Sequence, residues 1–300
     1  MGTRMTAGAA KAPLERQRST YIGQSNYNAG ILTIQKRLSH GLSLGANYTY
    51  SHALDDNLSN QNNAGFYGNS FHPGVDYGPS SYDRHHVFNA NYVYDLPIGN
   101  GRAIRTGKVL SEIVGGWYTS GIITMFSGLP LTVTESSQVF GGATSTITVN
   151  SAMIPTGSIA SSGVNGGSAG CTLSGVGSVG TTAATGSGFN LFSNPCAVYG
   201  SLRYIQLSSD TRTGRANPMR GLPVRNMDMR FGKDFALGGE ARRRLGFSAD
   251  FFNVFNHHNF STPSLNYTSP TSFGVITGTY TPANRTNSAR WIEMGLRLDF

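Results

Sequence analysis

Residues 42–50 read LSLGANYTY, and this stretch decides the fold class. Apolar and small polar side chains alternate through it without a break. One face carries Leu42, Leu44, Ala46, Tyr48 and Tyr50, and the other carries Ser43, Gly45, Asn47 and Thr49. A period of two residues is typical of a β-strand with one apolar face. The run is also close to the roughly 9–11 residues that a tilted strand needs to cross a membrane.

The same alternation recurs along the chain and predicts about seven strands in all. We expect the others at 28–38, 88–96, 117–127, 226–231, 245–251 and 292–300. The turn Ser39–Gly41 joins the first two strands into a hairpin. The stretch 117–127 is apolar on both faces, so the pattern does not orient it.

The lengths of the connections give an independent indication of the architecture. Short or medium links (39–41, 97–116 and 236–244) alternate with long ones (51–86, 128–224 and 256–290). Outer-membrane barrels have short periplasmic turns and longer extracellular loops. If the C-terminus is periplasmic, every long link falls on the extracellular side, which a β-sandwich has no reason to obey.

Composition agrees with strands and argues against a soluble helical domain. Charged residues make up 13% of the chain, against about 25% on average, and glycine is abundant, with 39 residues. No apolar run approaches the roughly 20 residues of a membrane-spanning helix. The sequence therefore predicts an all-β fold, specifically a partial antiparallel transmembrane β-barrel with long extracellular loops.

The net charge of +8 raises the question of nucleic acid. Apart from the cluster Arg242–Arg244, the basic residues are scattered, which favours solvated turns and a polar lumen. We expect no nucleic-acid partner.

Residues 1–20 lack the apolar region of a signal peptide, and an exported barrel needs one. We therefore expect the true N-terminus to lie upstream; the alternative is a cytoplasmic protein that needs no signal.

Cys171 and Cys196 are the two cysteines of the chain. Both lie in a Gly/Ser/Thr-rich stretch. In a chain that passes through the periplasm they are expected to form a disulfide. Free thiols are the alternative.

Several stretches resemble Oar-like TonB-dependent receptors. Residues 26–57, NYNAGILTIQKRLSHGLSLGANYTYSHALDDN, are similar to a hairpin of that family, and further similar stretches follow in family order at 76–99, 115–133, 217–235 and 247–263. The resemblance covers most of 26–300, except roughly 135–187. The terminal LRLDF, with Leu296, Leu298 and Phe300, resembles the C-terminal signal by which outer-membrane proteins are recognised for insertion.

The resemblance implies a barrel of about 22 strands filled by an N-terminal plug that touches TonB. About seven strands are too few to close such a barrel, so we expect a fragment without plug or TonB motif. We expect residues 1–27 to be an N-terminal loop and 28–300 the barrel segment, with 128–223 as a long extracellular loop. The implied location is the outer membrane of a Gram-negative cell. The implied partners are its lipid, the barrel-assembly machinery through the C-terminal strand, and TonB only through the missing N-terminal region. No residue identifies a transported ligand.

Two strings resemble catalytic or nucleotide-binding motifs. Residues 166–170 fit G-x-S-x-G and residues 175–180 fit G-x-G-x-x-G. Each motif needs a strand before it and a helix after it. Neither has a helical pattern following, so chance is the better interpretation. We expect no catalytic residue, no cofactor and no enzyme activity.

Two histidine pairs and an acidic stretch carry side chains of the types that bind metals. His85–His86 and His257–His258 lack the spacing of known metal motifs, which favours hydrogen-bonded histidines at the barrel rim. The oxygen-rich stretch of Asp55, Asp56, Asn57, Asn60, Asn62 and Asn63 lacks calcium-loop spacing, which favours a solvated loop. We expect no metal site.

The leading hypothesis for the function is the wall of a barrel for energy-dependent uptake. The rival hypothesis is a secreted β-sandwich or adhesin that binds a glycan or surface partner.

Overall fold

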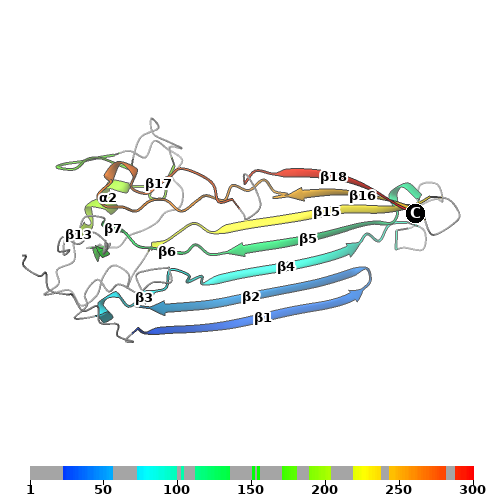
Figure 1. Ribbon diagram of the computed structural model, residues 1–300, viewed down its shortest axis with the longest axis horizontal. Coiled ribbons are helices and arrows are strands. Elements are labelled where there is room, and N and C mark those ends of the chain that lie inside the picture. The colour runs from blue at the N-terminus through cyan, green and yellow to red at the C-terminus, as the bar shows by residue number, and fades with distance from the viewer. Residues whose placement is uncertain are drawn as a thin grey trace, which may run out of the picture.

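The computed structural model describes residues 23–56, 73–99, 103–104, 112–135, 151–152, 154–155, 171–180, 189–203, 219–237, 243–281 and 288–300. Its main element is one antiparallel sheet whose seven long strands run in the order β1-β2-β4-β5-β15-β16-β18 (Figure 1). Their bounds are β1 Ser25–Ser39, β2 Leu42–Asp55, β4 His86–Asp95, β5 Trp117–Phe126, β15 Val224–Ala236, β16 Arg244–Phe252 and β18 Trp291–Asp299. Each overlaps a predicted strand, so the all-β prediction and the count of about seven are confirmed.

The β1–β2 hairpin turns at His40 and Gly41. Both have positive φ, 52° and 78°, which suits the twist of a two-residue hairpin turn. A Cβ on Gly41 would lie 3.0 Å from the carbonyl oxygen of Asp95, so the position also needs glycine for space. The pairing register shifts between Lys36 and Ser39, at the place where Lys36 interrupts the apolar alternation. β1 begins three residues before the expected start, and residues 1–22 lie outside the described residues.

Pairing supplies the orientation of β5 that the sequence left open. Gly121 lies opposite Tyr92 of β4 and Met229 of β15. Directly paired residues share a face of the sheet. The alternate residues Thr119, Ile123 and Met125 of β5 therefore lie on this apolar face with Gly121. A Cβ at position 121 would lie 2.7 Å from the Tyr92 ring, so glycine makes room for the aromatic side chain.

The sheet has two unlike ends. The turn end carries the links His40–Gly41, 96–116 and 237–243 together with the C-terminus, and the loop end carries the links 56–85, 127–223 and 253–290 (Figure 1). The predicted alternation of shorter and long connections is therefore confirmed. Among the described residues, no helix is long and apolar enough to cross a membrane.

The loop end contains a hydrophobic core, which we call the loop cap. Its buried residues come from two separate links and are Leu131, Val133, Val179, Leu191, Phe192, Val198, Tyr199, Leu202, Met219, Leu265 and Phe273. Short elements surround it: β6 Pro130–Leu131, β10 Cys171–Leu173, β11 Gly177–Val179, β12 Phe189–Asn190, α2 Pro195–Gly200, β13 Leu202–Arg203, β14 Met219–Arg220, η4 Pro270–Ser272 and β17 Val275–Ile276. The described parts of the stretch predicted only as a long loop therefore contribute to a packed core.

Cys171 of β10 and Cys196 of α2 form a disulfide at the edge of the loop cap. Their Cα atoms lie 6.0 Å apart, and both residues pack against the buried core. The first turn of α2 is capped by Asn194, whose side-chain oxygen accepts a hydrogen bond from the Ala197 N–H at 3.0 Å. The cap stabilises the first turn of the short helix, and the disulfide joins the helix to the β10–β11 hairpin.

Candidate functional site

A short segment before β4, Ser80–His85, is fixed against the end of β2. The Ser80 N–H donates to the Ala53 carbonyl oxygen at 2.9 Å, and the Ser51 N–H donates to the His85 carbonyl oxygen at 3.0 Å. Both ends of the segment are therefore held, and the side chains between them point in defined directions. The side chains of Asp83 and His85 meet there, with Asp83 Oδ2 3.2 Å from His85 Nε2.

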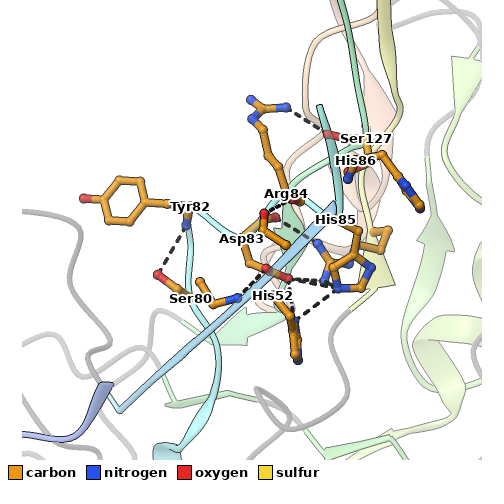
Figure 2. Close-up of polar contacts among 11 residues, drawn as sticks. His52, Ser80, Tyr82, Asp83, Arg84, His85, His86 and Ser127 are labelled. Atoms are coloured by element: carbon orange, nitrogen blue, oxygen red, sulfur yellow. Dashed lines mark hydrogen bonds and ion pairs between the residues drawn. The ribbon is translucent and has the colours of Figure 1, made fainter. Parts of the chain in front are cut away.

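Asp83 is the centre of the candidate site. Its side chain is fully buried, with 0% exposure. One carboxylate oxygen, Oδ1, accepts a hydrogen bond from the Ala53 N–H at 2.7 Å. The other, Oδ2, faces His52 and His85 (Figure 2). It also forms an ion pair with Arg220. A buried carboxylate is stable only with such partners, because burial otherwise penalises its charge.

Three ligand-type atoms, one of which is Asp83 Oδ2, form a nearly equilateral triangle. His52 Nδ1 lies 3.2 Å from this oxygen, and His85 Nε2 also lies 3.2 Å from it. The two ring nitrogens are themselves 3.2 Å apart. The side chains of His52 and His85 are 41% and 34% exposed, whereas that of Asp83 is fully buried.

Arg220 of β14 reaches this triangle from the loop cap. Its Nη2 donates to Asp83 Oδ2 and to His85 Nε2, the latter at 2.6 Å, and its Nη1 donates to the Asp83 carbonyl oxygen at 2.9 Å. Because arginine carries only donors, His85 Nε2 must be the acceptor in this contact, so His85 is neutral. The site thus holds one cationic group against one carboxylate and two imidazoles.

The pKa values of the site follow from these contacts. Burial opposes ionisation of Asp83, but hydrogen bonds from Arg220 and Ala53 outweigh it and hold the pKa of the carboxyl below its ordinary value. Burial and then the charge of Arg220 lower the pKa of His85, against the opposing charge of Asp83. Asp83 is therefore charged and His85 neutral at pH 7.

The residues next to His85 point elsewhere. Arg84 Nη1 donates to the Ser127 carbonyl oxygen at 2.8 Å, and its guanidinium lies 3.9 Å from the centre of the Phe126 ring. His86 Nδ1 lies 2.7 Å from the Tyr48 hydroxyl oxygen. The two adjacent histidines are both hydrogen-bonded at the loop end, but only His85 belongs to the site.

The other histidine pair and the acidic stretch are not part of this site. His257 and His258 are exposed. Asp56 is buried and its Oδ2 accepts a hydrogen bond from the Gln24 N–H at 2.9 Å. The asparagines of that stretch, Asn57, Asn60, Asn62 and Asn63, lie outside the described residues.

Of the two motif-like strings, the structure describes only the one at residues 175–180. Residues 166–170 lie outside the described residues. The string 175–180 forms the turn and second strand of the β10–β11 hairpin, where Gly175, Gly177 and Gly180 have φ of 79°, 94° and 63°. These glycines adopt backbone that other residues rarely take. In this hairpin they therefore serve turn geometry.

Sequence reasoning named His85 but missed His52, Asp83 and Arg220 as its partners. The two-residue spacing of Asp83 and His85 was the local signal available. His52 and Arg220 approach from 33 and 135 positions away. The residues of the C-terminal signal, Leu296, Leu298 and Phe300, lie on or just after β18, and their side chains are 74%, 49% and 90% exposed.

Comparison with known proteins identifies the class to which this sheet belongs. Residues 6–292 match the model of the outer membrane beta barrel domain family, and the chain belongs to that family. Its location is therefore the outer membrane, where the sheet contacts membrane lipid. This finding overturns the rival interpretation of a secreted sandwich. No curated protein and no solved structure matches the chain.

Proposed function

We propose that the chain forms part of the wall of a transporter of the TonB-dependent receptor type, which takes up a ligand across the outer membrane with energy supplied through TonB. The observation that carries the proposal is a single sheet of seven long strands with one mostly apolar and one polar face. The resemblance to Oar-like receptors supports the finer assignment. The role requires the chain to bind and pass a ligand, with no chemical step.

The apolar face suits contact with lipid. One cross-strand row on this face consists of Leu44, Tyr92, Gly121, Met229, Phe251 and Ile292. Apolar rows of this kind form the outer band of membrane barrels. We therefore assign this face to the lipid side of the wall.

The polar face suits an aqueous lumen. One cross-strand row on it consists of Thr33, Asn47, Asn89, Thr124 and Asn226. A second row places Arg230 opposite Asp250, with two hydrogen bonds of 2.5 and 2.8 Å. Paired charges and amides are stable where water reaches them but not in lipid. A ligand that passes along this face would meet both charged and uncharged hydrogen-bonding groups.

The edges of the sheet support a larger barrel. Among the described residues, β1 pairs only with β2, and β18 pairs only with β16. In lipid the backbone groups of such edges need partners, so the proposal requires further strands beside them. We assign residues 28–300 to the barrel segment, the link 128–223 to the extracellular side, and Leu296, Leu298 and Phe300 to recognition by the assembly machinery.

Growth on scarce nutrients tests the transport role. A strain without this gene is compared with a strain without TonB across a panel of nutrients at limiting concentration. The proposal expects at least one nutrient for which both strains grow poorly and the gene restores growth. If the strain without this gene grows poorly on a nutrient but the strain without TonB grows normally on it, the protein would instead act as a passive pore. Equal growth of the deletion strain on every nutrient would contradict transport.

A further inference from the structure

We infer that His52, Asp83 and His85 form a binding site for a divalent transition-metal ion at the loop end, and that Arg220 occupies this site when the metal is absent. The class of ligand is an ion of the Zn²⁺, Co²⁺ or Ni²⁺ type. The inference is independent of the transport role, because it rests on the geometry of the site alone. It departs from the sequence analysis, which favoured no metal site.

The spacing of the three atoms matches a metal-binding face. Donor atoms at about 2.0–2.1 Å from one ion lie roughly 2.9–3.4 Å apart at octahedral to tetrahedral angles. All three separations among His52 Nδ1, Asp83 Oδ2 and His85 Nε2 are 3.2 Å. One ion can therefore contact all three atoms without movement of the backbone.

The ligand types and their support also fit. Two imidazoles and one carboxylate suit zinc and its neighbours in the first transition row, and they leave positions open for water or a ligand. The Ala53 N–H holds the other carboxylate oxygen of Asp83 at 2.7 Å, which aims Oδ2 at the triangle. Metal binding through Nδ1 requires only that neutral His52 carry its proton on Nε2.

Arg220 is the resident competitor of the ion. Its Nη2 lies within hydrogen-bond distance of two of the three corners, so the guanidinium and a metal cannot be held together. The Arg220 side chain is 27% exposed and has a route to solvent. The neighbouring residue Met219 is buried in the loop cap, so the backbone of β14 can stay in place when the side chain leaves. Exchange thus needs only a side-chain rotation.

Cobalt titration of the purified full chain in detergent tests the competition. Arg220→Met keeps the apolar stem and removes the charge, and it should bind Co²⁺ at least about ten-fold more tightly than the wild type. Adding His52→Ala or Asp83→Asn to this variant should abolish the gain, and adding His258→Ala should leave it unchanged. Equal affinity of the wild type and Arg220→Met, or a gain that survives loss of His52, would overturn the inference.

A second measurement uses the unmodified protein and does not depend on the folding of variants. Histidines are modified chemically with and without Zn²⁺ and then mapped by mass spectrometry. The inference expects Zn²⁺ to protect His52 and His85 but not His258. Absence of protection, or equal protection of all three, would show an adventitious ion only and would reject the site.

Discussion

Asp83 and Arg220 lie 137 positions apart in the chain and are joined twice, by an ion pair between their side chains and by a hydrogen bond from Arg220 Nη1 to the Asp83 carbonyl oxygen. Asp83 belongs to the segment held against β2, whereas Arg220 follows Met219 of the loop-cap core. The pair therefore ties the loop cap to the wall of the sheet.

Removal of this tie should loosen both partners together. Arg220→Ala should destabilise the docking of residues 80–85 by about 1.5–3 kcal/mol, because the hydrogen bonds it removes involve charged groups. Hydrogen exchange of residues 80–85 and 219–222 measures the effect, with Arg230→Ala as a control elsewhere on the sheet. Asp83→Asn and Arg220→Ala should be less than additive in combination. Full additivity would show that the two residues act separately.

The site should also respond to pH. The pKa of His85 is lowered from 6.5 by burial and by the charge of Arg220. As the pH falls, the His85 ring binds a proton more readily in the unfolded segment than in the folded one. The contribution of neutral His85 to the stability of the folded segment is therefore full above about pH 6.5 and decreases below it. NMR titration of the His85 ring should give a pKa below 6.5, and Arg220→Ala should raise it. A value at or above 6.5 in the wild type would contradict this assignment of charges.

The loop cap should unfold separately from the sheet when a large side chain is removed from its core. Phe192 and Phe273 are both 0% exposed, and their ring centres lie 5.5 Å apart. Phe273→Ala should cost about 3–5 kcal/mol of cap stability, since it leaves a cavity in packed surroundings. Faster hydrogen exchange at 189–203 with unchanged exchange in β4 would be the signature. Phe255→Ala is the matched control, because that side chain is 75% exposed and should matter little.

Protein from the cell envelope should contain the Cys171–Cys196 bond. The two residues are 25 positions apart, and closing such a loop should contribute about 3 kcal/mol to the stability of the cap. Alkylation followed by mass spectrometry should label neither cysteine until a reductant is added. Labelling of both thiols without reduction would show that the bond is absent in the cell.

The two faces of β16 should differ in their contact with lipid. Ala249 pairs with Phe231 and Met294 on the apolar face, whereas Ser248 lies on the polar face. Ala249→Arg should cost about 2–4 kcal/mol near the membrane midplane, and Ser248→Arg much less. A spin label at 249 in the membrane-inserted barrel should be relaxed by oxygen and shielded from a water-soluble nickel reagent. The label at 248 should behave in the opposite way. Access to position 249 mainly from water would mean that the assignment of faces is wrong.

Local sequence was sufficient to predict the strands, because the alternation of apolar and polar residues lies within each strand. The prediction failed where a side chain has its partner outside the strand. β15 was expected at 226–231 but extends to Ala236. Lys233 interrupts the alternation there, and its ammonium group donates to the carbonyl oxygens of Glu112 and Ile113, which lets a cation lie on the apolar face.

The candidate site and the loop cap were harder to predict for a different reason. The site joins residues from β2, the segment before β4 and β14, and no spacing in the sequence connects them. The cap is built from a stretch rich in Gly, Ser and Thr, a composition typical of open loops. Its few large residues, such as Leu191 and Phe192, become a core only with Leu265 and Phe273 from another link.

This shared core has a consequence for protein engineering. The links 127–223 and 253–290 supply the two halves of one interior, so they form a single exchangeable cassette. Grafting only one of them onto another barrel would leave Leu191 and Phe192, or Leu265 and Phe273, facing water. A chimera that carries both links, together with Asp83 and its neighbours as the mounting point, is the smallest transplant we expect to retain the shape of this surface.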